Sequence, residues 1–457
     1  MRPGTLARRA DCVDRTPRRF APVSEGFPPR PFSPRLTHFH NSEGDPMLRG
    51  IRSSMFCALG LMAAACGNEG ARTQEEPPVQ LVPEAWMGET AGADLPRLEA
   101  LGDVQMLTGV NAEELFREAA TRPAASAKTA APERPEAERS FIGIDVKNQK
   151  AYRLRTDEAN LGRVADELAR RGLNGASRGT LDDASAQPVR GEAPATSDTV
   201  SGQTWSNGVD TRIRMAITDG YASNSWPYRT IGHLSAGCSG ALVGRRVVVT
   251  AAHCVVSAYS GWNPIFNTFT ARRDGGTAAW GVQDAIWYWV PEQYINGTCT
   301  NAGNCNPHDF AIMVLADNFP NGHPGWMGHW NASTDTLKQW SMYMRGYPGC
   351  SHASAPVSCT SRTLYGDVNL CRTGNAYSPD ADGWHREIDI SCDGSPGQSG
   401  SPIYSYDAPV SGPVVVGQYN QYYCTGTGCA GNAFPNTMGH LTPSWNNTIS
   451  YFKSLYP

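Results

Sequence analysis

The sequence predicts an all-β fold in its C-terminal half, built as a barrel or a sandwich and preceded by a small α/β segment. From about Thr204 onward, short apolar runs alternate with Gly, Asn and Pro turns. The 457-residue chain has 47 Gly and 33 Pro, and only 18% of its residues are charged. This pattern is typical of turn-rich β proteins. The net charge of −4 provides no basic surplus, which argues against a nucleic-acid partner.

The first 66 residues are expected to lie outside the folded enzyme. Residues 1–46 are rich in Arg and Pro without apolar periodicity, which predicts a disordered or non-native extension ahead of a start at Met47. Residues 47–66 have the layout of a signal peptide: a positive start, a short apolar run and small residues at the end. The ending Ala63-Ala64-Ala65-Cys66 resembles a bacterial lipoprotein signal, so lipid attachment at Cys66 and ordinary cleavage nearby both stay open.

Residues 67–203 are predicted to form a pro-region with linkers. Apolar residues alternate on either side of a polar turn between residues 142 and 154, which predicts a β-hairpin. Residues 157–171 carry apolar residues at helical spacing and are followed by Gly172, so one amphipathic helix is expected there. Residues 173–207 are loop-like in composition, and a maturing cut is expected among them. An uncleaved spacer is the alternative.

Residues 204–457 are predicted to be the enzyme domain. Five apolar runs are expected to be strands: Ile213–Ile217, Arg246–Thr250, Phe310–Leu315, Ser341–Arg345 and Pro413–Gly417. The chain ends with a predicted helix. Thr442 can cap this helix, Pro443 suits its first turn, and apolar residues recur at helical spacing as far as Leu455.

Cysteine usage indicates an oxidising compartment. Of 13 cysteines, ten lie between Cys238 and Cys429, an even number that allows up to five disulfides. A zinc site is the competing interpretation, but no paired CxxC spacing supports it.

The first chemically informative string contains a histidine. An apolar strand, Val247–Thr250, leads directly into Ala251-Ala252-His253-Cys254. Cys238 and Cys254 are expected to form a disulfide that pins the turn beneath His253. A general base must be held in one orientation, and a stapled turn suits that role.

The second string is His308-Asp309 at the start of an apolar strand. A buried aspartate in this position is costly unless it is hydrogen-bonded. Beside a catalytic histidine, it would accept from the imidazole and fix its tautomer. Taken alone, such an aspartate is more often a turn residue.

The third string is Gly397-Gln398-Ser399-Gly400-Ser401-Pro402. Glycines on both sides of Ser399 permit a tight turn that exposes its hydroxyl. The backbone N–H groups of Gly397 and Ser399 are then expected to converge on one oxygen as an oxyanion hole.

In this order and spacing, the three strings resemble the chymotrypsin-like serine proteases over about residues 205–457. The resemblance implies two six-stranded antiparallel β-barrels with a C-terminal helix, with the site between the barrels. It implies Ser399 as nucleophile, His253 as general base and Asp309 as the residue that orients the base. No cofactor and no metal are expected.

Within this superfamily, the sequence is more similar to bacterial glutamyl endopeptidases than to trypsin. The similarity rests on Gln398, Ser401, the string from Gly346 to Gly349 and the Asp210-x-Arg212 motif. In trypsin, an aspartate precedes the nucleophile and pairs with the new N-terminal amine on activation. Gln398 cannot do this, so activation is expected to differ and to work through removal of a folded pro-region.

The sequence departs from the glutamyl pattern where specificity is set. Glutamyl enzymes hold the substrate carboxylate with a Thr and a His, and the corresponding positions here are Gly394 and Tyr419. Asp393 lies six residues before Ser399, where trypsin keeps the aspartate that selects Arg or Lys. We therefore expect Asp393, Gly394, Tyr419 and Asn420 to bind substrate, with the preferred side chain open.

The sequence thus predicts a bacterial serine endopeptidase that acts on proteins or peptides as a monomer. It is expected to be secreted, or held at the outer membrane through Cys66 until the pro-region is cut. Two alternatives stay open: an inactive binding module of the same fold at the cell surface, and an esterase using the same three residues. The presence of all three residues favours an active enzyme.

Overall fold

The computed structural model describes residues 97–109, 138–178, 210–215, 225–257, 263–296, 308–316, 319–351, 355–356, 358–367, 370–376, 386–422 and 436–457. All of them fall within Glu75–Pro457. The expected extension, signal peptide and Cys66 lie outside these residues. Within these ranges, no helix is long and apolar enough to cross a membrane.

Nine strands form the first sheet, in the order β1-β3-β2-β11-β10-β5-β6-β7-β12. The strand β12 pairs back onto β11, so the last six strands close into an antiparallel barrel, and the first predicted barrel is confirmed. The strands of this sheet are β1 (Arg97–Asp103), β2 (Glu138–Asp145), β3 (Lys150–Asp157), β5 (Ile231–Leu234), β6 (Ser239–Leu242), β7 (Val247–Thr250), β10 (Thr268–Ala271), β11 (Gln283–Pro291) and β12 (Ala311–Leu315).

The second sheet has the order β16-β17-β20-β19-β18-β14-β15-β4, with β13 parallel to β19. In the described residues it forms a half-barrel rather than a closed one, because β4 pairs only with β15 and β16 only with β17. Its strands are β4 (Arg212–Arg214), β13 (Gly328–His329), β14 (Tyr343–Gly346), β15 (Tyr365–Asp367), β16 (Thr373–Ala376), β17 (Glu387–Ile390), β18 (Pro402–Ser405), β19 (Val414–Tyr422) and β20 (Asn436–His440).

Short elements connect the sheets. The strands β8 (Val256–Ser257) and β9 (Asn263–Pro264) form a small hairpin. The helices are α2 (Glu158–Arg170), η3 (Tyr228–Thr230), η4 (Ala252–Cys254), α3 (Glu292–Asn296), α4 (Thr334–Leu337) and α5 (Pro443–Leu455).

The barrel strands are buried on both faces, which explains their continuous apolar sequences. In β7, Val248 packs into one core cluster, whereas Val247 and Val249 pack into another on the opposite face. Strand side chains alternate between faces, so a strand covered on both sides must be apolar at every position. The cluster that contains Val247 and Val249 also contains Trp445 and Phe452 of α5, so it lies between the barrel and this helix.

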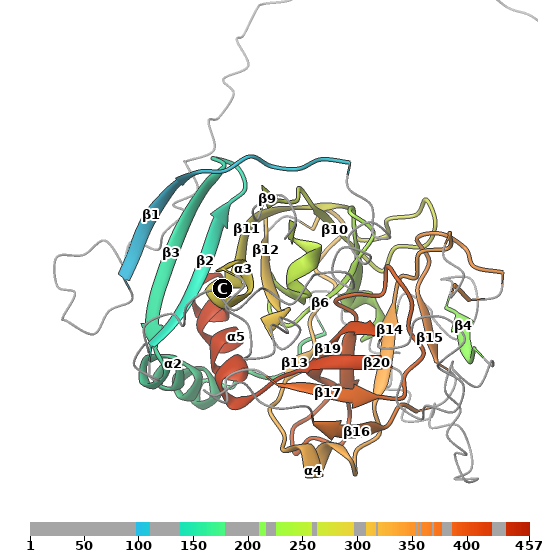
Figure 1. Ribbon diagram of the computed structural model, residues 1–457. Coiled ribbons are helices and arrows are strands. Elements are labelled where there is room, and N and C mark those ends of the chain that lie inside the picture. The colour runs from blue at the N-terminus through green and yellow to red at the C-terminus, as the bar shows by residue number, and fades with distance from the viewer. Residues whose placement is uncertain are drawn as a thin grey trace, which may run out of the picture. The chain divides into compact units, whose positions relative to one another are not determined.

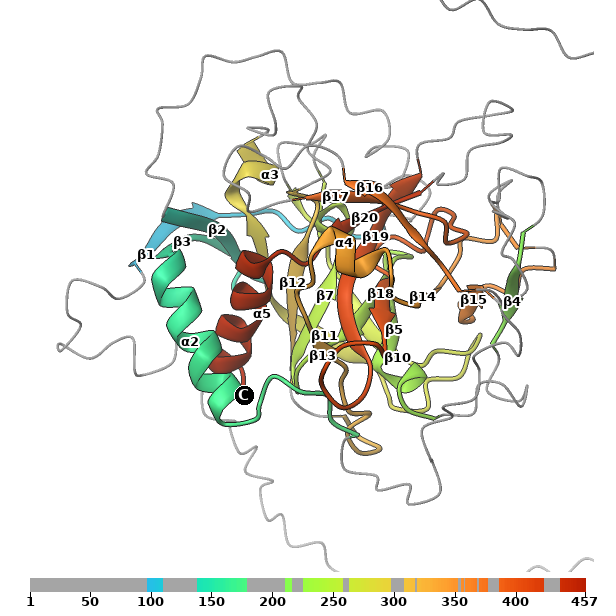
Figure 2. The same ribbon diagram turned by 90° about the horizontal axis from the view of Figure 1, so that it is seen from below.

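The predicted hairpin and helix at residues 138–170 are both present. The strand β2 pairs with β3 on one side and with β11 of the barrel on the other, and Figure 1 shows these strands as one continuous sheet. Asp157 caps α2 by accepting the N–H of Asn160 at 2.6 Å. Gly172, at φ +71°, lies just beyond its end, as expected for a C-terminal glycine. Figure 2 shows α2 alongside α5.

The C-terminal helix is also confirmed. The Thr442 hydroxyl accepts the N–H of Trp445 at 3.4 Å, and Pro443 is the first helical residue. The helix buries Trp445, Ile449 and Phe452, the spacing that the sequence predicted. One polar residue is buried with them: the Nζ of Lys453 is enclosed and has no hydrogen-bond partner in the described chain.

Burial lowers the pKa of Lys453 to about 7. The folded state therefore loses this proton near neutral pH, whereas the unfolded chain keeps it until about pH 10.4. Since the unfolded state binds more protons in this window, the group makes the fold more stable as pH rises through 7. Lys453→Met should stabilise the protein most at pH 5–6, and the gain should shrink by pH 9.

Chemical denaturation at pH 5, 7 and 9 measures this effect. The matched control is Lys338→Met at an exposed position, which should leave the pH dependence of the unfolding free energy unchanged. If Lys453→Met and the wild type show the same pH dependence, the assignment is wrong.

Candidate active site

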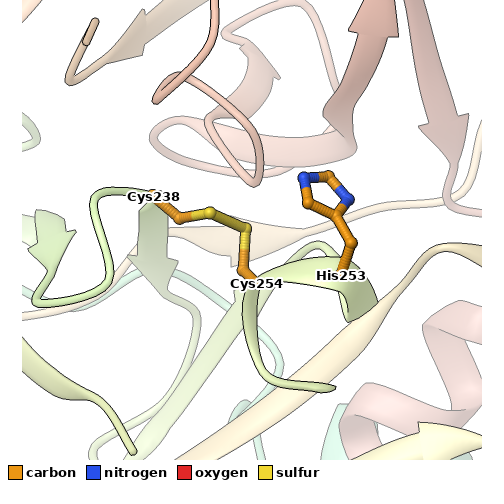
Figure 3. Close-up of side chains that lie close together, drawn as sticks. All are labelled: Cys238, His253 and Cys254. Carbon is orange, nitrogen blue, oxygen red and sulfur yellow. A yellow bond between two sulfur atoms is a disulfide. The ribbon is translucent and has the colours of Figure 1, made fainter. Parts of the chain in front are cut away.

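A stapled turn holds His253 at the end of β7. The helical turn η4 begins at Ala252, two positions after Thr250, and carries His253 with Cys254. A disulfide joins Cys254 to Cys238, the residue before β6, as the sequence predicted. Figure 3 shows this disulfide beside the imidazole. The Asn267 side chain donates to the Cys254 carbonyl oxygen at 2.7 Å and holds the same turn from β10.

Asp309 fixes the orientation of the His253 ring. The carboxylate accepts the backbone N–H of His253 at 2.9 Å and contacts ring Nδ1 at 2.7 Å. A carboxylate only accepts hydrogen bonds, so the proton lies on Nδ1. The Nε2 atom is buried and has no partner among the described residues. Such a ring, oriented on one side and free to accept on the other, can serve as a base.

The loop carrying Ser399 is tight because glycine is required at two positions. Gly397 and Gly400 have φ of +93° and +79°. A Cβ on Gly397 would lie 2.5 Å from the Gly349 nitrogen, and one on Gly400 would lie 2.3 Å from the Ser239 carbonyl oxygen. No other residue type fits either position without backbone movement.

The same loop presents unused hydrogen-bonding groups. The Ser399 hydroxyl is buried without a partner in the described structure. Alternate N–H groups of the loop are satisfied: Gln398 donates to the Ser395 carbonyl and Gly400 to the Tyr419 carbonyl. The N–H groups of Gly397 and Ser399 donate to nothing among the described residues. These are the two donors expected to form an oxyanion hole.

Ser239, at the start of β6, joins this loop to the first barrel. Its N–H donates to the Ser399 carbonyl oxygen at 2.9 Å, and its hydroxyl donates to the Gly397 carbonyl oxygen at 3.0 Å. The hydroxyl also accepts the Tyr347 N–H, at 2.9 Å. The Sγ of Cys254 lies 3.8 Å from the Ser399 carbonyl oxygen. The Ser399 loop therefore lies against the turn that carries His253.

Arg212 holds Gln398, the residue before Ser399. The buried guanidinium of Arg212 donates to the Gln398 side-chain oxygen and, at 2.8 Å, to the Ser395 hydroxyl. Asp210 balances the charge at 2.7 Å. The Asp210-x-Arg212 motif, which the sequence offered only as a family similarity, thus positions the Ser399 loop.

Asp393 is held within the protein. Its Oδ2 accepts the Thr211 N–H at 2.8 Å and the Thr211 hydroxyl at 2.9 Å. Burial raises the pKa of this carboxyl. Burial, and then the charge of Asp393, raise the pKa of neighbouring Asp367 well above its usual range. The other carboxylate oxygen, Oδ1, is buried and has no partner among the described residues, so substrate binding by Asp393 stays a prediction.

Gly394 and Tyr419 contact each other. A Cβ on Gly394 would lie 2.5 Å from the Tyr419 hydroxyl, so the tyrosine ring occupies the space that a Thr side chain would need. Asn420 is also buried, and its side-chain oxygen accepts from Gln418 at 3.2 Å. Gln418 in turn donates to the Asp309 carbonyl oxygen at 2.8 Å. Through Gln418, the strand β19 is hydrogen-bonded to the backbone of Asp309.

Two more disulfides are present among the described residues, Cys350–Cys359 and Cys371–Cys392, within the limit of five that the cysteine count allows. The other four cysteines of residues 238–429 lie outside the described residues. Two buried groups of described side chains have metal-ligand types, but each contains both cysteines of one disulfide. Disulfide sulfurs carry no thiolate, so each group is left with only one metal-binding residue, His253 or Asp367.

Sequence reasoning missed three supporting residues: Ser239, Gln418 and Asn267. Ser239 lies next to Cys238, a residue already singled out from the sequence, and this adjacency was the available signal. Gln418 and Asn267 have no comparable local signal.

Removing the Arg212 side chain should loosen the Ser399 loop. We expect Arg212→Leu to lower kcat by about tenfold to a hundredfold, because small misplacements of reacting groups have effects of this size. The KM should change little. Steady-state kinetics on a peptide substrate measures both constants.

Arg214→Leu is the control, because Arg214 lies on the same strand and is exposed. Equal losses of kcat in both variants would contradict the positioning role of Arg212.

Gly394→Ala should be destabilising because of Tyr419. Forcing a methyl group into a packed contact costs about 1–3 kcal/mol of unfolding free energy. The smaller side chain of Tyr419→Val should reduce this cost, a coupling that a double-mutant cycle measures. Gly175→Ala is the control, since its Cβ would meet nothing within 4 Å. Additive effects at positions 394 and 419 would rule out the contact.

Comparison with known proteins agrees with this geometry. Residues 238–412 match the family model described as a trypsin-like peptidase domain. A glutamyl endopeptidase of Bacillus licheniformis is 27% identical over 201 residues, covering 43% of this chain and 54% of that protein. An extracellular metalloprotease of Bacillus subtilis is 27% identical over 208 residues, covering 43% of this chain and 56% of that protein. The chain spans about half the length of these curated relatives.

Two solved structures also match about half of the chain. A Glu endopeptidase in complex with MPD is 21% identical, covers 54% of this chain and 98% of its own, and has a TM-score of 0.41. The protease Anisep from Arthrobacter nicotinovorans is 18% identical, covers 49% of this chain and 97% of its own, and has a TM-score of 0.34. The predicted resemblance to chymotrypsin-like proteases, and to glutamyl endopeptidases among them, is confirmed.

Proposed function

We propose that this chain, whose residues 238–412 form a trypsin-like peptidase domain, is a secreted serine endopeptidase. Ser399, His253 and Asp309 are its catalytic residues. The observation that carries the proposal is the buried hydrogen bond of 2.7 Å between Asp309 and His253 Nδ1, which leaves Nε2 unpaired among the described residues. The same carboxylate accepts the backbone N–H of His253 at 2.9 Å, so the ring and the backbone of this residue are held together in one orientation.

Acylation of the enzyme begins with proton transfer to His253. Nε2 takes the hydroxyl proton of Ser399 as Oγ bonds to the carbonyl carbon of the substrate, and the carbonyl electron pair moves onto oxygen. Asp309 stabilises the imidazolium without taking a proton. The imidazolium then protonates the leaving amine as the C–N bond breaks, which leaves an acyl group on Ser399. Water repeats the sequence and releases the acid.

The N–H groups of Gly397 and Ser399 stabilise the oxyanion. Neither donates to another described group, so both are available when negative charge develops on the substrate oxygen. Each such donor typically contributes a factor of ~10²–10³ in rate.

Preference for glutamate is not supported by Gly394 and Tyr419. The B. licheniformis relative is a glutamyl endopeptidase by name. In this chain, the Tyr419 ring stands where a threonine side chain at position 394 would extend. We propose a substrate class of peptide bonds in proteins, with a side-chain preference different from that of the relative.

Secretion is supported by the disulfides. Three are present in the described residues, and disulfides persist mainly in oxidising compartments. On this ground we propose an extracellular location.

Digestion of a proteome-derived peptide library tests the proposal. Wild type should cut, and Ser399→Ala should lower cutting by at least about a thousandfold, as for loss of a catalytic serine elsewhere. Ser454→Ala, at an exposed position of α5, should cut like wild type. The residues found before the cut sites identify the preference.

The alternatives give other results. An esterase would hydrolyse activated esters but leave the peptide library intact. A binding module would leave both substrates intact in every variant.

A further inference from the structure

We propose that residues 138–178, here called the N-terminal unit, are a permanent part of the folded enzyme. The unit comprises β2, β3, α2 and the chain as far as Arg178. It binds β11 and α5 of the catalytic domain, residues 210–457. If the chain is cut between residues 179 and 209, the unit stays bound, and the product is a two-chain enzyme. This differs from the removable pro-region that the sequence predicted.

The unit completes an edge of the barrel. The strand β10 pairs with β11 only at residues 283 and 284. Further along β11, β2 takes over, with five registered pairs from Trp287–Asp145 to Pro291–Phe141. The other edge of β11 is occupied by β12. Without β2, residues 287–291 would be an unpaired strand edge, which natural proteins avoid because it promotes aggregation.

The unit also completes an apolar core. Phe141 packs edge-on against Phe452 and Trp445 of α5, with ring centroids 5.6 and 6.2 Å apart. Leu154 and Leu161 belong to the same buried cluster, and both are fully buried. Figure 2 shows α2 lying along α5. Loss of the unit would expose these aromatic rings together, forming a contiguous apolar patch of a kind that monomeric proteins rarely carry.

The buried carboxylate of Glu292 accepts hydrogen bonds from residues of the N-terminal unit. Glu292, directly after β11, has a side chain that is 2% exposed. It accepts from the Ser140 hydroxyl at 2.5 Å and from Arg153 at 3.1 Å. A buried charge requires such partners, and both come from β2 and β3.

The contact continues to the end of the unit. Ser177 and Trp326 exchange backbone hydrogen bonds of 2.9 and 2.8 Å. The Trp326 indole donates to the Gly175 carbonyl oxygen at 3.2 Å. The Arg229 guanidinium donates to the Arg178 carbonyl oxygen. The unit therefore touches the catalytic domain at three separate places: β11, α5 and the chain before β13.

A cut chain tests the proposal directly. A recognition site for a sequence-specific protease is placed between residues 179 and 209 in full-length protein carrying Ser399→Ala, which prevents self-digestion. After complete cutting, both pieces should elute together from a native sizing column and separate only in denaturant. Separation under native conditions would overturn the proposal.

Substitutions at two glycines test which contact holds the two pieces of the cut chain together. A Cβ on Gly143 would lie 2.4 Å from the Trp289 ring, whereas one on Gly162 would lie 3.8 Å from its nearest neighbour, Asn447. After cutting, Gly143→Val should lose the co-eluting piece, and Gly162→Ala should retain it. If Gly143→Val retains the piece as well as Gly162→Ala does, the pairing of β2 with β11 is not what holds the unit. If uncut Gly143→Val fails to fold, cut Gly162→Ala protein decides the question: co-elution of its two pieces supports a permanent unit, and their separation overturns the proposal.

Discussion

The position of one buried serine sets the geometry of the site. The backbone N–H of Ser239 donates to the Ser399 carbonyl oxygen, and its hydroxyl donates to the Gly397 carbonyl oxygen. Its own carbonyl oxygen accepts from Thr250, at the end of the strand that leads to His253. The base and the proposed nucleophile come from different sheets, and Ser239 bonds to the supports of both. Gly346 and Gly400 leave the room for this junction: a Cβ on Gly346 would lie 3.0 Å from the Ser239 hydroxyl, and one on Gly400 2.3 Å from its carbonyl oxygen.

A second layer of polar contacts holds the two halves in register. Gln418 of β19 donates to the Asp309 carbonyl oxygen, so the second sheet supports the residue that orients His253. Arg212 reaches Gln398 from β4 and holds the Ser399 loop on its other side. Buried hydrogen bonds of this kind have little tolerance for movement, because each unpaired group costs about 1–3 kcal/mol. The groups of His253, Ser399 and Gly397 that have no partner among the described residues lie among these contacts.

The sequence predicted what local signals encode. The histidine, aspartate and serine strings, the hairpin near residue 142, the helix α2 and the capped α5 all follow from spacing over a few residues. The pairing of β2 with β11 was not predictable in this way, because its partners are about 140 positions apart. Ser239 and Arg212 are ordinary residue types whose importance depends on partners more than 150 positions away. The closure of the second sheet was inferred from resemblance alone, and the described strands form a half-barrel instead.

The most direct test of the central claim is the site of covalent modification by a serine-directed fluorophosphonate. Processed protein is labelled to completion and digested, and the modified residue is located by tandem mass spectrometry. The account predicts a single adduct on Ser399, because its loop presents two N–H groups that donate to nothing else among the described residues and lies against the turn that carries the oriented His253. An adduct on a different serine, or no adduct under conditions that label a known serine protease, would contradict the account.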